Sequence, residues 1–115
     1  MSQSSKRRLE RRFPLKEPLP VRVLLRSLSR QSGRGVDGML MDASQNGMGI
    51  LVQERVALAS RCVVEVLTPK GSQAFQAEVC YATRTDEGIR LGILLDEAND
   101  PAILDYLSAM KIELL

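Results

Sequence analysis

The sequence predicts an all-β fold, a six-stranded antiparallel β-barrel followed by one C-terminal α-helix. Short apolar segments are separated at regular intervals by turn-forming residues, several of them alternate between apolar and polar positions, and only the last has helical spacing. With 115 residues, 44% of them hydrophobic, the chain is long enough to bury the core of a single domain.

The barrel is expected over residues 18–98. Pro14, Pro18 and Pro20 disfavour a helix before the first strand. The first three strands are expected over residues 21–28, 36–43 and 48–52, with turns at residues 32–35 and 44–47. Gly38 weakens the second of these strands.

Three further strands are expected over residues 62–68, 75–81 and 89–95, with turns at residues 69–72 and 85–88 between them. Two of them have one clearly apolar face, because apolar side chains recur at every second position. These apolar positions are Phe75, Ala77, Val79 and Tyr81 in one strand and Ile89, Leu91, Ile93 and Leu95 in the other.

The helix is expected over residues 99–115. Asn99 or Asp100 can serve as its N-cap, with Pro101 at the first helical position. An apolar stripe then recurs with helical spacing at Ile103, Leu107, Met110 and Leu114. The last two leucines fit either a frayed end or a dimer contact.

The composition argues against an enzyme and against a metal site. The chain has no histidine, which excludes His-based catalysis and the common zinc sites. Cys62 and Cys80 do not form a CxxC pair, and we expect both to be small buried hydrophobes. No apolar run approaches the roughly 20 residues that span a bilayer, and no signal peptide is evident, so we expect a cytoplasmic protein.

Positive charge is concentrated in residues 1–17, which we expect to form a flexible basic arm. This arm has six basic residues against two acidic ones, a net charge of +4, whereas residues 18–115 have ten against twelve, a net charge of −2. A basic arm on a mildly acidic body favours an anionic partner.

Two short motifs suggest what that anion could be. Arg8 and Arg12 form an RxxxR pair, and a guanidinium can fork onto a phosphate, stack on a base or donate to guanine. Asp42, Ser44 and Gly47 form a DxSxxG turn, in which the carboxylate can accept two hydrogen bonds from the edge of guanine and the glycine permits close approach. Alone, the first also fits a solvated tail and the second an ordinary hairpin loop.

The two motifs in this order, with Asp42 30 residues after Arg12, resemble those of the PilZ domain family. The apolar start at residues 13–15, the strand at residues 89–95 and the final helix also fit, so the resemblance covers residues 6–110. It implies a six-stranded barrel that acts as a bacterial receptor for cyclic di-GMP. Arg8 and Arg12 would clamp this ligand, and Asp42, Ser44 and Gly47 would surround a guanine.

The resemblance also bears on stoichiometry. Arg7 directly precedes the motif, and in the family an arginine there is associated with a stacked dimer of the ligand. Arg7 and Arg11 fit RxxxR as well, but we prefer Arg8 and Arg12, because Arg12 directly precedes the apolar start.

Three functions are compatible with this sequence. In the first, cyclic di-GMP orders the arm on the barrel and changes the contact with an unidentified downstream protein. In the second, the chain is a PilZ-fold interaction module without nucleotide binding, although it has both motifs. In the third, the arm binds nucleic acid, which an aromatic content of 3% and the acidic body disfavour.

Overall fold

The computed structural model describes residues 10–25, 34–58 and 60–115. In this part of the chain, six strands are followed by one short helix, which confirms the predicted fold class. The elements are β1 (Phe13–Leu25), β2 (Arg34–Ser44), β3 (Gly47–Val52), β4 (Arg61–Thr68), β5 (Gly71–Thr85), β6 (Gly88–Leu95) and α2 (Ile103–Ala109).

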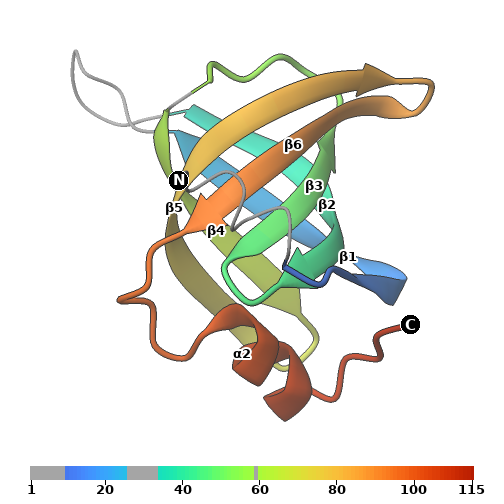
Figure 1. The fold of residues 1–115 in the computed structure, drawn as a ribbon, viewed down its shortest axis with the longest axis vertical. Helices are drawn as coiled ribbons and strands as arrows, with labels where there is room; N and C mark the ends of the chain where they lie inside the picture. The colour runs from blue at the N-terminus through green and yellow to red at the C-terminus, as the bar shows by residue number, and fades with distance from the viewer. Residues whose placement is uncertain (1–9, 26–33, 59) are drawn as a thin grey trace.

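The strands close into a barrel in the order β1-β2-β3-β6-β5-β4, and all neighbours are antiparallel (Figure 1). Four of the pairings join consecutive strands, whereas β3 pairs with β6 and β1 with β4 over long stretches of sequence. Because β1 and β4 close the ring, the sheet has no free edge.

The first strand begins earlier than the sequence predicts. Residues 13–17, assigned there to the arm, belong to β1, where Pro14 pairs with Asp42 of β2. The register then shifts between Pro14 and Leu19, so the segment that contains Pro18 lies in an irregularity of the ladder. Proline is tolerated at such a position because no regular backbone hydrogen bond is lost there.

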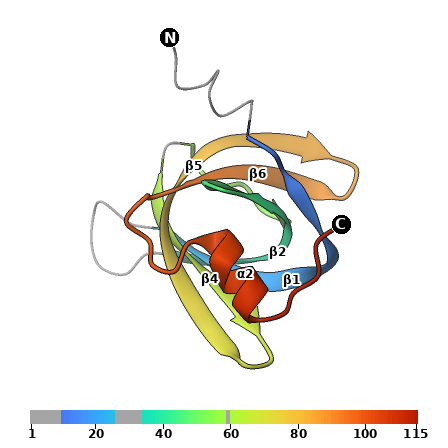
Figure 2. The same ribbon diagram turned by 60° about the horizontal axis from the view of Figure 1, so that its bottom comes forward.

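The core is formed by the inward-facing side chains of all six strands. The largest fully buried side chains come from β1 to β6 and from α2: Phe75, Leu40, Met48, Ile50, Leu91, Ile103, Leu107, Val21, Val23, Val36, Val52 and Val64. Helix α2 covers one end of the barrel (Figure 2), and its Tyr106 meets Phe75 edge to face with ring centroids 5.7 Å apart. Cys62 is buried as expected, and burial raises the pKa of its thiol to about 11, whereas Cys80 is only half-buried.

Helix α2 begins later than the sequence predicts. Its N-cap is Ala102, without a side-chain capping hydrogen bond, rather than Asn99 or Asp100. The Asn99 side chain instead binds the backbone of Gln76 in β5, accepting from its N–H at 2.8 Å and donating to its carbonyl at 2.9 Å. These partners explain why Asn99 does not cap the helix.

The helix also ends earlier than predicted. After Ala109 the chain reverses, and Leu114 forms a β-bridge with Leu15 of β1, supported by hydrogen bonds from Leu115 N to the Pro14 carbonyl at 2.8 Å and from Lys16 N to the Glu113 carbonyl at 2.9 Å. The end of the described chain is therefore attached to the first strand (Figure 1).

A β-bulge in β5 changes the face on which Tyr81 lies. Phe75, Ala77 and Val79 are buried as the alternation predicts, but the register of β5 against β6 shifts between Val79 and Tyr81. The expected buried position of Tyr81 is therefore wrong, and this residue is 47% exposed on the outside of the barrel. An extra residue in one strand reverses the inside–outside alternation beyond it.

Candidate functional site

A second bulge, in β2, turns the DxSxxG motif outward. The register of β2 against β3 shifts between Leu40 and Asp42, and Leu40 and Ala43 are both fully buried although they are three positions apart. In a regular strand, Leu40 and Asp42 would share one face. Because of the bulge, Asp42 and Ser44 leave the core and face the outside of the barrel, where the end of the arm covers them.

Arg12 lies directly against Asp42. It precedes β1, and the pairing of Phe13 with Ala43 and of Pro14 with Asp42 brings the two segments together. The Arg12 guanidinium donates from Nη2 and Nε to Asp42 Oδ1, at 2.8 and 3.2 Å. The basic segment and the acidic turn, 30 residues apart in sequence, thus form one site.

A second arginine, Arg90 of β6, reaches the same carboxylate from the opposite side. Its Nη2 pairs with Asp42 Oδ2, so each oxygen of Asp42 faces a different arginine. Between them lies Gly49 of β3, where an added Cβ would lie 2.5 Å from Asp42 Oδ1 and 2.6 Å from Arg90 Nη2. The absence of a side chain at Gly49 is therefore what makes this ion pair possible.

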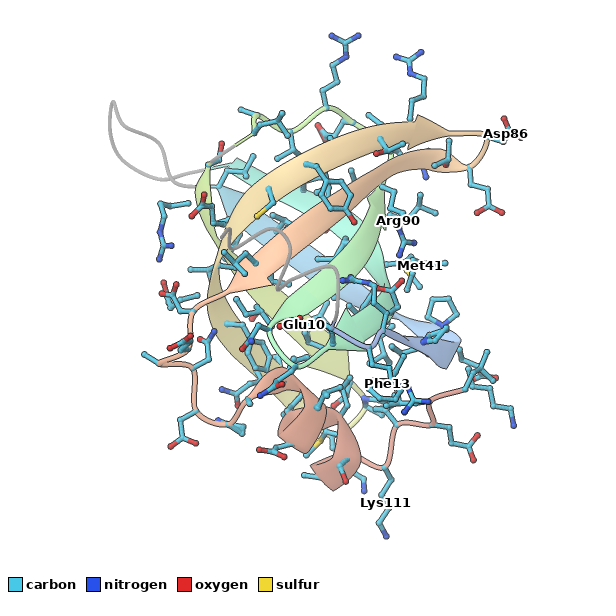
Figure 3. The ribbon with its side chains drawn as sticks, viewed as in Figure 1. Glu10, Phe13, Met41, Asp86, Arg90 and Lys111 are labelled. Atoms are coloured by element: carbon cyan, nitrogen blue, oxygen red, sulfur yellow. The ribbon has the colours of Figure 1, made fainter. Side chains whose placement is uncertain are left out.

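Glu10 of the arm occupies the turn itself. Its carboxylate accepts a hydrogen bond from Ser44 Oγ at 2.8 Å and another from Asn46 Nδ2 at 2.9 Å. A backbone hydrogen bond from Leu95 N to the Asn46 carbonyl, at 2.9 Å, also holds this turn against the end of β6. An acidic residue of the arm, Glu10, thus contacts Ser44, and a basic residue of the barrel, Arg90, contacts Asp42; both are labelled in Figure 3.

The structure brings together four of the residues that the sequence predicts for the site: Arg12, Asp42, Ser44 and Gly47. A Cβ added at Gly47 would lie 3.1 Å from Ser44 Oγ and 3.8 Å from Arg12 Nη1, which shows how closely the site is packed there. Arg7 and Arg8 lie outside the described residues. Within the arm, Arg12 pairs with Asp42, whereas the Arg11 guanidinium lies over the ring of Phe13, 5.6 Å from its centroid. The register that joins Arg12 to Arg8 stays a prediction.

Sequence reasoning missed Glu10, Gly49 and Arg90. The strand alternation does indicate that Arg90 faces outward, because its neighbours Leu91 and Ile93 face the core. It does not indicate that β6 lies beside β3, because that pairing joins segments about 40 residues apart. No signal in the sequence identified Glu10 as a partner of the turn.

The site has charged groups of both signs in close balance. Arg12 and Arg90 are paired with Asp42, and Glu10 is paired with neutral donors, so an anionic ligand would have to exchange existing contacts. In the described part of the chain, no three His, Cys, Asp or Glu side chains come together to hold a metal ion. No helix of that part has the length and apolar character needed to cross a membrane.

The fold and the site define a small antiparallel barrel whose N-terminal segment is attached to an outward-facing polar turn. The model of the PilZ domain matches residues 6–109, and the chain belongs to this family. No curated protein was found to match the sequence.

The solved structures that are similar in fold include two of YcgR. YcgR from Escherichia coli in complex with c-di-GMP is 20% identical with a TM-score of 0.67, over 91% of this chain and 44% of the YcgR chain. The PilZ domain of YcgR from Escherichia coli with c-di-GMP is 14% identical with a TM-score of 0.62, over 91% of this chain and 98% of that one. At these identities the similarity shows the fold alone, and the chain spans less than half the length of the longer YcgR chain.

Proposed function

We propose that this protein is a receptor for cyclic di-GMP and has no catalytic role. The observation that carries the proposal is the convergence of Arg12 with Asp42, Ser44 and Gly47 at one outward-facing site. Both halves of the family's motif pair are present, and both structural neighbours described above contain c-di-GMP.

Each residue has a chemical role in this proposal. Arg12, together with Arg8, would fork onto a phosphate or stack on a guanine. Asp42 would accept hydrogen bonds from the guanine edge, Ser44 would add a small polar contact, and Gly47 would allow the flat base to approach. Arg7 would support a second, stacked molecule of the ligand.

The proposed signal is a rearrangement of the arm. Residues 10–12 already contact the barrel through Glu10 and Arg12, so ligand binding would exchange these contacts for contacts with phosphate and base. Each charged hydrogen bond contributes about 1.5–3 kcal/mol, comparable to the cost of about 1–2 kcal/mol for fixing each arm residue. The new arm conformation would change the surface seen by a downstream protein.

Calorimetric titration with cyclic di-GMP tests the proposal. We expect the wild-type protein to bind, and Arg12→Ala and Asp42→Ala each to lose most of the affinity while the barrel stays folded. Arg22→Ala is the matched control, because Arg22 also pairs with an aspartate, Asp37, but on an exposed part of the barrel. Unchanged affinity in both site variants would reject the site, and one nucleotide per chain would reject the stacked dimer.

A further inference from the structure

We infer that Arg90 is a positioning residue of the nucleotide site, which holds the Asp42 carboxylate in place when Arg12 turns to the ligand. This inference rests on the proposed function and adds a residue from outside both sequence motifs. It starts from the division of one carboxylate between two arginines: Oδ1 faces Arg12, and Oδ2 faces Arg90.

The two arginines differ in how firmly the backbone holds them. Arg12 precedes β1 at the end of the arm, and its side chain is 39% exposed. Arg90 lies within β6, whose backbone is paired on both sides, with Leu51 of β3 and Thr83 of β5. Of the two partners of Asp42, Arg12 can therefore leave when the arm moves, and Arg90 stays.

Two glycines on the outer surface of the sheet leave room for larger side chains beside Arg90. Asp42, Gly49, Gly92 and Tyr81 are paired in a row across β2, β3, β6 and β5. The Arg90 guanidinium lies over Gly49, and the Tyr81 ring lies over Gly92. Because Gly49 has no side chain, the guanidinium rests on the sheet and reaches Asp42 across β3.

Counting hydrogen-bond sites shows what this arrangement leaves for a ligand. A carboxylate has about four acceptor positions, and Arg12 uses Oδ1 twice while Arg90 uses Oδ2 once. When Arg12 leaves, Oδ1 becomes free and Arg90 still fixes the plane of the carboxylate. The free positions suit the two adjacent N–H donors of guanine, whereas adenine lacks the N1–H donor, so we expect Arg90 to contribute to discrimination between these bases.

The test compares Arg90→Met, which keeps length but removes charge and donors, with Arg84→Met. Arg84 is an exposed arginine of the same hairpin and serves as the control. We expect Arg90→Met to weaken cyclic di-GMP binding about tenfold, equivalent to about 1.4 kcal/mol, and to reduce the preference for cyclic di-GMP over cyclic di-AMP. Arg90→Lys keeps the charge and should recover part of the affinity, and Arg84→Met should bind like the wild type.

A double-mutant cycle separates positioning from a direct effect of charge. If Arg90 acts through Asp42, Arg90→Met will have no further effect on affinity in an Asp42→Asn background. Wild-type affinity in Arg90→Met, or an equal loss in both backgrounds, would overturn the inference.

The same double-mutant cycle can be measured without ligand, with the free energy of unfolding in urea as the readout. It distinguishes a failure of the proposed receptor function from a failure of the positioning role of Arg90. A wild-type protein that does not bind cyclic di-GMP would reject the proposed function and, with it, the nucleotide part of this inference. The unfolding cycle would still show whether Arg90 and Asp42 are coupled, and additive effects of the two substitutions would reject the positioning role itself.

Discussion

Ser44 donates a hydrogen bond of 2.8 Å to the carboxylate of Glu10, which lies 34 residues earlier in the chain. An acid of the arm thus occupies the turn that the proposal assigns to an anionic ligand. Glu10 lies between Arg8 and Arg12 in the sequence, so the segment that supplies the arginines also supplies an internal competitor for Ser44. Binding then requires Glu10 to leave, and the apparent affinity is reduced by the fraction of molecules in which it remains.

Replacing Glu10 with Gln is therefore expected to strengthen cyclic di-GMP binding about three- to tenfold. The amide keeps an acceptor for Ser44 but presents a donor to Asn46 and removes the negative charge, so the competing contact weakens by about 1 kcal/mol. Calorimetric titration measures the change. Glu17→Gln, an exposed acid of β1, serves as the control and should leave the affinity unchanged, and weaker binding by Glu10→Gln would refute competition.

Gly49→Ala should disrupt the site without altering any charged residue. Its new methyl group would lie 2.5 Å from Asp42 Oδ1, so the carboxylate and the Arg90 guanidinium must move apart. We expect cyclic di-GMP binding to fall at least tenfold and the free energy of unfolding to fall by about 1–3 kcal/mol. Gly35→Ala is the control, because its Cβ would meet only side-chain atoms of Leu24 and Arg22, at 3.3 Å and beyond. Equal affinities in the two variants would contradict the packing argument.

The strands could be predicted because they depend on local patterns. The alternation in β6 and the turn at residues 44–47 match the structure closely. The bulges could not be predicted, because an extra residue in a strand is defined only by its partner strand. For this reason the alternation places Tyr81 on the buried face although it is exposed, and the outward position of Asp42 becomes visible only from its pairing with β3.

The residues of the candidate site also fall into a group that the sequence predicts and a group that only the strand pairing reveals. Arg12, Asp42, Ser44 and Gly47 could be proposed because they fall into two short motifs. Arg90 and Gly49 could not, because their role depends on β6 lying beside β3, a pairing across about 40 residues. The apolar spacing also predicts a helix that continues to Leu114, but the helix ends at Ala109 and Leu114 pairs with Leu15 of β1.

Stability should fall at high pH because of Cys62. Burial raises the pKa of its thiol from 9.0 to about 11, so the unfolded chain loses this proton first as the pH rises. The contribution is fully present below pH 9 and is lost as the pH rises from 9 to about 11, by about 3 kcal/mol at most. Urea unfolding of the wild type and of Cys62→Ala across this range gives the difference. If the two proteins lose stability in parallel, the thiol is not the cause.

Tyr106→Phe should leave the protein equally stable or make it more stable by up to about 1 kcal/mol. The hydroxyl of Tyr106 is buried without a hydrogen-bond partner among the described residues, so removing it also removes an uncompensated polar group. The edge-to-face contact with Phe75 does not depend on the hydroxyl. Tyr81→Phe, at an exposed ring, is the control for the loss of a hydroxyl in general. A marked decrease in the melting temperature of Tyr106→Phe alone would show that the hydroxyl has a stabilising partner.

Lys111→Gly should stabilise the end of α2. Lys111 has a φ of 61°, in the left-handed region that disfavours a side chain. Among the residues that the structure describes, no other non-glycine residue has a positive φ. Around it the chain forms a helix-ending turn, in which Lys111 N donates to the Ser108 carbonyl at 3.0 Å and Ile112 N to the Leu107 carbonyl at 2.9 Å. Glycine is the usual residue at this position, because it adopts the conformation without steric cost.

The gain should be about 0.5–1 kcal/mol, since the strain removed exceeds the added flexibility of the unfolded chain. Ser108→Gly, at an exposed position within the helix, is the opposite control and should cost about 1 kcal/mol. Thermal unfolding of the two variants beside the wild type measures both changes. A destabilised Lys111→Gly would mean that the lysine side chain contributes more at this position than its backbone strain costs.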